Sequence, residues 1–235
     1  MKQRDLFYLQ KLAEDIKNTN EALNFIKFRT DDCRLYCEAS NGICYSHIWE
    51  DITPQQSIDG LYRFDASATF DDVKLEQARY LYNNKGDIIA EQIRDLDYPN
   101  LNIGKQGLYH ATFDCKEIFN ILKYTLARYK NGEKLQYRVT FILNKNMWEV
   151  YGIRKDEVEY AKKVPCDLRD SVVDDNFKFT LNAHTLRTIL RWHESGSIDF
   201  YFHNISGTVF ENIVIINPEK LDRISVIRPM SVRTI

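Results

Sequence analysis

The sequence predicts an α+β protein made of two similar parts, with mainly antiparallel sheets and about four helices on one side. Three observations support this class. Alternating, strand-like segments are numerous, a turn-rich interruption near residue 100 divides the chain, and the order helix, strands, helix, strands is found in both parts. A doubly wound α/β fold would need regular alternation of strand and helix, which the sequence lacks.

The first part follows this order. Its expected elements are a helix over 5–18, a strand over 25–29, hairpin strands over 33–40 and 43–49, an aromatic strand over 60–64, and a short helix followed by a strand within 71–82. Phe7 falls opposite the apolar side of the first helix. Asn41-Gly42 is expected to form a two-residue hairpin turn. The segment 71–82 also fits a strand throughout, and the repeat of the pattern favours the helix.

The boundary between the parts is expected at Asp97 to Gly107, where Pro, two Gly and two Asn interrupt the periodic sequence. Two similar domains, 1–104 and 105–235, follow from this boundary. The expected elements of the second part are a strand over 108–113, a helix over 115–130 capped by Asp114, strands over 135–143, 148–153, 157–164 and 177–181, a helix over 183–194 capped by Asn182, and strands over 198–203, 208–216 and 224–227.

Composition excludes several classes of protein. The 235 residues are 44% hydrophobic and 28% charged, which is typical of a globular chain and not of a disordered one. Apolar runs such as 213–216 are far shorter than the roughly 20 residues of a membrane-spanning helix, and no signal-peptide core follows residue 1. We therefore expect a soluble, cytoplasmic protein with no membrane partner. The net charge of −2 combines −5 over residues 1–105 with +3 over 106–235.

Catalytic and metal-binding templates find little support. The sequence has no phosphate-binding loop, no HExxH and no GxSxG motif. Cys33, Cys37, Cys44 and His47 have metal-like spacing, but a turn at 41–42 pairs residue 39 with 44 and residue 37 with 46, so the cysteines share one sheet face and His47 lies on the other. We expect reduced thiols, no cofactor, no metal and no catalytic residues. An enzyme with a site built from cysteines or carboxylates stays a third alternative.

The helices offer a different signal, since their exposed sides are basic. At 100° per residue, Lys116, Lys123 and Lys130 share one flank of the 115–130 helix. His184, Arg187 and Arg191 share a flank of the 183–194 helix. Lys11 lies on the first helix, where Asp5, Glu14 and Asp15 dilute the charge. Such flanks are usually just solvated, but two in one repeat unit could bind successive phosphates.

Several local strings resemble the DNA polymerase sliding clamp family, particularly its bacterial and phage type. They are the opening helix with 23–29 and the Asn-Gly hairpin, Asp97-Tyr98-Pro99-Asn100-Leu101, 176–183 followed by the Leu186, Ile189 and Leu190 helix, and the closing segment from Ser206-Gly207-Thr208 to Val226-Ile227-Arg228-Pro229-Met230. Two departures stand out. Bacterial clamps have three domains per chain, and Arg228 stands where the family usually has Met.

The resemblance implies a clamp-like fold of two domains, each with antiparallel sheets outside and two helices on the inner face. Because a six-domain ring of two-domain chains needs three subunits, it implies a homotrimer. The implied function is that of a processivity factor for DNA replication, a ring around double-stranded DNA that tethers a DNA polymerase and is placed there by a clamp loader. The basic flanks would face DNA. Partner peptides would bind an apolar pocket formed with Val226, Arg228, Pro229 and Met230.

An alternative keeps the fold without the ring. A clamp-derived adaptor, or a decoy that binds replication proteins, would also explain the acidic first part. A monomeric mass without DNA binding would favour this alternative.

Overall fold

The structure is a computed structural model of the chain, and the residues that it describes are 3–14, 25–31, 33–52, 58–64, 79–82, 85–93, 109–127, 137–144, 147–155, 157–165, 177–193, 196–203 and 212–230.

Contacts between residues divide the chain into two compact units. The first unit comprises Met1–Asn102 with Asp222–Ile224, and the second comprises Ile103–Leu221 with Ser225–Ile235. The sequence predicts one boundary after residue 104, and the contacts divide the chain after Asn102. The assignment of the short segment 222–224 to the first unit was not expected, because its partners are distant in sequence.

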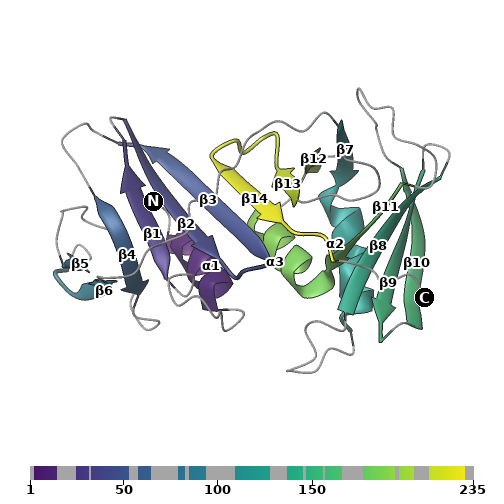
Figure 1. The fold of residues 1–235 in the computed structure, drawn as a ribbon, viewed down its shortest axis with the longest axis horizontal. Coiled ribbons are helices and arrows are strands. Elements are labelled where there is room, and N and C mark those ends of the chain that lie inside the picture. Colours follow the sequence, from purple (N-terminus) through teal and green to yellow (C-terminus); the bar gives the residue numbers. More distant parts are fainter. Residues whose placement is uncertain are drawn as a thin grey trace. The chain divides into compact units, whose positions relative to one another are not determined.

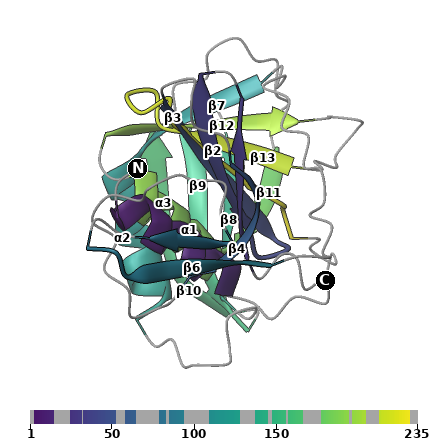
Figure 2. The ribbon, with the colours of Figure 1, turned by 90° about the vertical axis from the view of Figure 1, so that its left-hand side faces the viewer.

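The first unit is one helix against an antiparallel sheet. Its elements are α1 (Gln3–Glu14), β1 (Ile26–Thr30), β2 (Arg34–Ser40), β3 (Cys44–Asp51), β4 (Asp59–Phe64), β5 (Tyr80–Tyr82) and β6 (Ile88–Ile93). The strands lie in the order β5-β6-β4-β1-β2-β3. Figure 1 and Figure 2 show α1, in purple, beside the strands of this unit, and it contacts β1, β2 and β3. Leu6, Leu9 and Leu12 point into this contact and are buried.

The hairpin of β2 and β3 exists, but its pairing differs from the expected one. Cys37 pairs with Ile48 and Ala39 with Ser46, two residues further along β3 than a turn at 41–42 requires. Because a shift of two residues conserves the faces of a strand, His47 still lies opposite the face of Cys37.

The physical reason is the side chain of Asn41. Its Oδ1 accepts hydrogen bonds from the backbone N–H of Ile43 at 3.0 Å and of Cys44 at 2.7 Å. The backbone N–H of Asn41 also donates to the carbonyl of Cys44 at 3.0 Å. Gly42, with φ of 80°, therefore becomes the first central residue of the turn, where the type II′ geometry calls for glycine.

The segment 71–82 is described only in part. Tyr80–Tyr82 forms β5, which confirms the expected strand. The expected short helix before it falls within 65–78, outside the described residues.

The second unit has two antiparallel sheets and two helices. Its elements are β7 (Tyr109–Asp114), α2 (Cys115–Thr125), β8 (Tyr137–Asn144), β9 (Met147–Arg154), β10 (Glu157–Pro165), β11 (Lys178–Asn182), α3 (Ala183–His193), β12 (Ser197–His203), β13 (Asn212–Ile216) and β14 (Arg223–Ile227), the last of which begins with residues of the first unit. One sheet has the order β14-β13-β12-β7 and the other the order β10-β9-β8-β11. The expected α+β class with antiparallel sheets is confirmed.

An aromatic cluster joins the two sheets of the second unit. Phe113 and Phe200 come from β7 and β12, and their ring centroids are 5.0 Å apart. Phe141 and Phe179 come from β8 and β11 and stack at 4.6 Å. Trp148 of β9 packs against Phe113 and Phe179. All five side chains are buried, so this cluster is the centre of the core in this unit.

Both helices of the second unit begin as the sequence predicts. The Asp114 carboxylate accepts a hydrogen bond from the N–H of Glu117 at 3.0 Å, and the Asn182 side chain accepts one from the N–H of Thr185 at 2.9 Å. In both cases a strand leads directly into its helix through the capping residue.

The prediction that the first of these helices continues to residue 130 was wrong. The helix α2 ends at Thr125, because the N–H of Ala127 bonds the carbonyl of Tyr124, three residues back, and tightens the last turn. Residues 128–130 lie outside the described part of the chain.

Gly152 of β9 supports the end of α2 by having no side chain. A Cβ at this position would lie 2.0 Å from Oγ1 of Thr125, which donates a hydrogen bond to the carbonyl of Ile121. We predict that Gly152→Ala lowers the free energy of unfolding by about 1–3 kcal/mol, because it overpacks this contact. Urea denaturation measures the change.

The control for this prediction is Thr125→Ala, alone and combined with Gly152→Ala. The double variant should be more stable than the sum of the two single effects allows, because truncation removes the clashing oxygen. An unchanged urea midpoint for Gly152→Ala would contradict the close packing of α2 on β9.

Candidate nucleic-acid interface

The exposed side of α2 is basic, as the helical spacing predicts. Lys116 and Lys123 are exposed, while Ile118, Ile121 and Leu122 are buried against the sheet. The acid on this helix turns elsewhere: the Glu117 carboxylate pairs with the Lys162 ammonium of β10. The two exposed lysines are therefore not offset by the carboxylate of their own helix.

The exposed side of α3 carries two arginines. Arg191 is exposed, and Arg187 and His184 are half-buried. Partial burial, and secondly the positive charge of Arg191, lower the pKa of Arg187 from its ordinary value. This direction means that the charged guanidinium lacks compensation, and a bound anion would supply it.

The two helices contact each other, which brings their cations together. The thiol of Cys115 approaches the carbonyl of Leu190 at 3.9 Å, and the Arg191 guanidinium lies 6.0 Å from the centroid of the Phe119 ring. Phe119 is three residues after Lys116 and four before Lys123, so all three share a side of α2.

We call this surface the α2–α3 basic face, defined by Lys116, Lys123, Arg187 and Arg191. None of the four forms an ion pair with another residue in the described part of the chain. A row of uncompensated cations on two adjacent helices can bind phosphates without reading a sequence.

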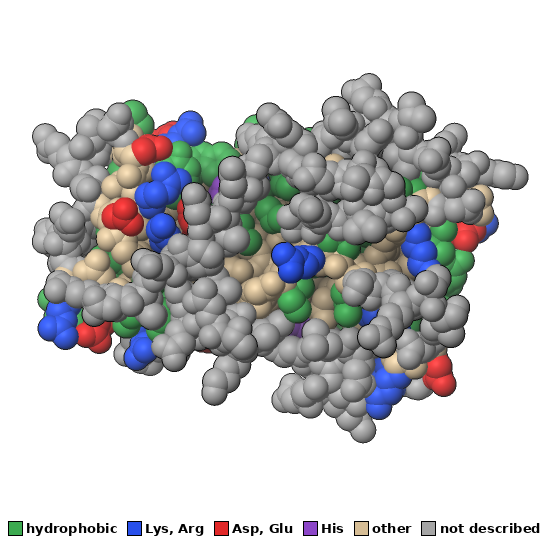
Figure 3. Space-filling model, in the orientation of Figure 1, with side chains coloured by type: hydrophobic (Ala, Val, Ile, Leu, Met, Phe, Trp, Pro, Cys, Tyr) green, Lys and Arg blue, Asp and Glu red, His purple; other side chains and the backbone are tan. Residues whose placement is uncertain are grey.

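The remaining predicted DNA-facing residues are not brought into this face. Lys11 is exposed on α1 of the first unit, and Lys130 lies outside the described residues. In Figure 3 most of the described basic side chains (blue) lie near acidic ones (red), so the side of the molecule shown there offers no continuous basic area among the described residues.

The predicted pocket residues follow one another at the end of β14. Val226, Pro229 and Met230 are half-buried and Arg228 is exposed. The backbone N–H of Met230 donates to the carbonyl of Thr180 at 2.8 Å, which fixes this segment beside β11. Their burial is that of a strand edge with partly accessible apolar side chains.

The structure has a cavity elsewhere that the sequence did not indicate. Its volume is about 280 Å³, and it is lined by residues of the first unit, namely Asp5, Ile48, Trp49, Glu50, Asp51, Asp222 and Arg223. None of the predicted pocket residues lines it. Its charged groups are distant in sequence, so no local motif signals it.

The cysteine and histidine cluster has no metal-site geometry. Cys37 and Cys44 are buried, Cys33 is exposed, and His47 lies on the other face of the sheet. Burial raises the pKa of Cys37 well above its ordinary value, and burial raises that of Cys115 to about 11, so these thiols stay protonated near neutral pH. The described residues contain no group of three or more His, Cys, Asp or Glu side chains arranged to hold a metal ion.

Two exposed aromatic side chains accompany the basic helices, which the sequence did not lead us to expect. Phe7 on α1 is 52% exposed, as its place on the helical wheel indicates. Tyr124 on α2 is 57% exposed and stacks on Tyr160 of β10 with 5.0 Å between centroids. The tyrosine pair joins residues on two elements, which no spacing within a helix shows.

No helix in the described part of the chain is long and apolar enough to cross a membrane.

Comparison with known proteins identifies the fold. No protein-family model and no curated protein matches the chain. Among solved structures, the DNA polymerase III subunit beta from Pseudomonas aeruginosa superimposes with a TM-score of 0.75 at 12% identity, over 99% of this chain and 66% of that one.

Two further structures agree. The beta subunit of DNA polymerase III from Thermotoga maritima gives a TM-score of 0.74 at 15% identity, over 99% of this chain and 65% of that one. The beta sliding clamp of Caulobacter crescentus gives 0.71 at 12% identity, over 99% and 64%. The chain thus has the sliding-clamp fold, as the resemblance implies, and spans just under two thirds of the length of these structures.

Proposed function

We propose that this chain is a processivity factor of DNA replication, a sliding clamp that encircles double-stranded DNA and tethers replication proteins without reading a sequence. The observation that carries the proposal is the α2–α3 basic face on a chain with the sliding-clamp fold. Phosphate contacts from Lys and Arg are independent of sequence, and a ring that makes only such contacts can move along the duplex. The proposed role is topological and involves no catalysis.

The proposed assembly is a homotrimeric ring in which each compact unit is one clamp-like domain. Two units per chain and six domains per ring require three subunits. The chain spans only 64–66% of the solved clamps that it resembles, which fits two domains where those proteins have more chain.

The proposed partners are duplex DNA, a DNA polymerase and a clamp loader, in the cytoplasm. Val226, Pro229 and Met230 are half-buried apolar residues at the end of β14 and would receive a partner peptide. The exposed Arg228 would add a positive charge at the rim and favour a peptide with an acidic residue at that position.

A second candidate is an adaptor or decoy that keeps the fold and binds replication proteins without forming a ring. The net charge of −5 over residues 1–105 favours it, because an acidic unit is repelled by DNA. DNA affinity and mass in solution separate it from the first candidate.

The α2–α3 basic face predicts the salt dependence of DNA binding. Lys123→Gln should weaken binding to a duplex and lower the slope of log affinity against log salt by about 0.9, the value for one lost phosphate contact. Fluorescence anisotropy with a labelled duplex, over a salt series, measures both quantities.

The matched control is Lys178→Gln, which removes an equally exposed lysine from β11 of the same unit. It should leave the affinity and the slope unchanged. Equal effects of the two variants would show that binding depends on general charge and would remove α2 from the interface.

The proposed assembly predicts the mass in solution. Light scattering across a dilution series should give about 83 kDa, the mass of three chains of 27.8 kDa. A mass of one chain that persists at high concentration would contradict the trimer and favour the adaptor.

A further inference from the structure

The helix α1 exposes an aromatic ring between two cations. Leu6, Leu9 and Leu12 bury one side of the helix, and Arg4, Phe7 and Lys11 lie on the other. Spacings of three and four residues place the last three on one face, one turn above the other. We call this surface, defined by Arg4, Phe7 and Lys11, the α1 face.

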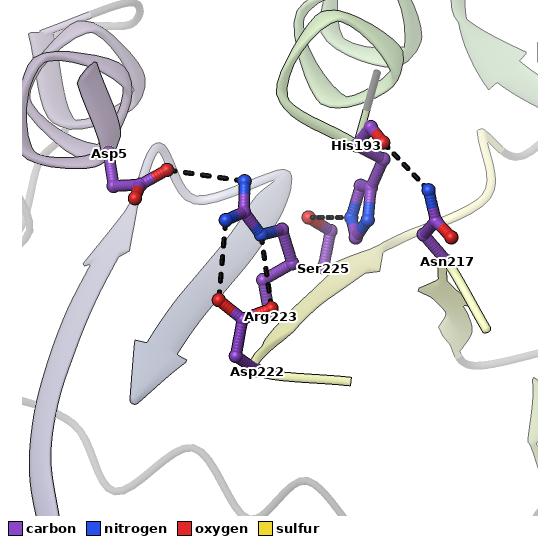
Figure 4. Close-up of polar contacts among 6 residues, drawn as sticks. All are labelled: Asp5, His193, Asn217, Asp222, Arg223 and Ser225. Atoms are coloured by element: carbon purple, nitrogen blue, oxygen red, sulfur yellow. Dashed lines mark hydrogen bonds and ion pairs between the residues drawn. The ribbon is translucent and has the colours of Figure 1, made fainter. Parts of the chain in front are cut away.

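The acid that the sequence places on this helix does not reduce the charge of the α1 face. Asp5 is 3% exposed, and its carboxylate is 3.2 Å from the buried guanidinium of Arg223, which also pairs with Asp222 (Figure 4). The Glu14 carboxylate accepts a hydrogen bond from Nε2 of Gln10 at 3.0 Å. The expectation that Asp5 dilutes the basic charge of this helix was therefore wrong.

The ring of Phe7 is held at the surface by Lys11. The Lys11 ammonium lies 5.3 Å from the ring centroid, within range of a cation–π contact. Within the described residues Phe7 meets no other ring, whereas the exposed Tyr124 of the second unit is already stacked on Tyr160. Phe7 therefore keeps an aromatic surface available for a ligand.

The chemistry of the α1 face selects its ligand. Two cations attract a polyanion, and an exposed aromatic ring gains most from a second π face. A duplex presents phosphates but keeps the faces of its bases inside the stack, whereas unpaired nucleotides present both. An apolar protein partner would gain from Phe7 but not from the flanking cations.

We propose that the α1 face binds unpaired nucleotides of DNA, with a base stacked on Phe7 and the neighbouring phosphates at Arg4 and Lys11. This inference rests on the proposed function and adds a ligand to it. A clamp with such a face binds DNA at a junction between duplex and single strand more tightly than it binds blunt duplex.

The test compares anisotropy titrations of a labelled thymidine oligonucleotide and a labelled blunt duplex. Phe7→Ala should weaken binding of the single strand about tenfold, which corresponds to about 1.4 kcal/mol and to the stacking of one base. Its affinity for the duplex should change less than twofold. Phe7→Leu should behave like Phe7→Ala, because leucine fills space but has no π face, and Phe7→Trp should bind at least as tightly as the unchanged chain.

The matched control is Ile88→Ala on β6, since Ile88 is also 52% exposed and belongs to the same unit. It should leave both affinities unchanged. Thermal unfolding of each variant checks that the fold is retained.

Three results would overturn the inference while leaving the proposed function intact: unchanged affinity of Phe7→Ala for the single strand, an equal loss for both DNAs, or full affinity of Phe7→Leu. A chain that binds neither DNA at low salt would overturn the proposed function together with the inference.

Discussion

The amphipathic burial of the helices is the constraint on which the surface depends. Each described helix packs its apolar side on a sheet, so that residues such as Leu9, Leu122 and Ile189 are almost inaccessible to solvent. Only the opposite side of each helix can meet a ligand. Because that side is basic on α2 and α3, the packing that stabilises the second unit also determines which charges it can offer to DNA.

Buried polar contacts complete this arrangement. In the first unit Asp5 and Arg223 remove one carboxylate from the surface of α1 (Figure 4). In the second unit His193, at the end of α3, approaches the hydroxyl of Ser225 at 3.1 Å, and Asn217 donates to its backbone carbonyl at 2.8 Å. Such contacts are costly to break, because each leaves a polar group buried without its partner.

Much of this could be predicted from local sequence, and the remainder depends on partners far along the chain. Helical spacing predicted the exposure of Phe7, Lys123 and Arg191, since exposure follows from periodicity alone. The hairpin register could not be predicted, because the Asn41 side chain bonds two backbone amides and moves the turn by one residue. The position of Asp5 could not be predicted either, since it depends on Arg223, more than two hundred residues away.

The most direct test of the proposed clamp is retention on closed circular DNA. The chain, loaded onto nicked circular plasmid, should co-elute with it in gel filtration and should dissociate when one restriction cut linearises the plasmid, because a ring slides off free ends. The salt at which elution is run should matter little for the circle, since the link is topological. Equal release from the circular and the linear plasmid would contradict encirclement and leave a protein with the fold of a clamp but another role.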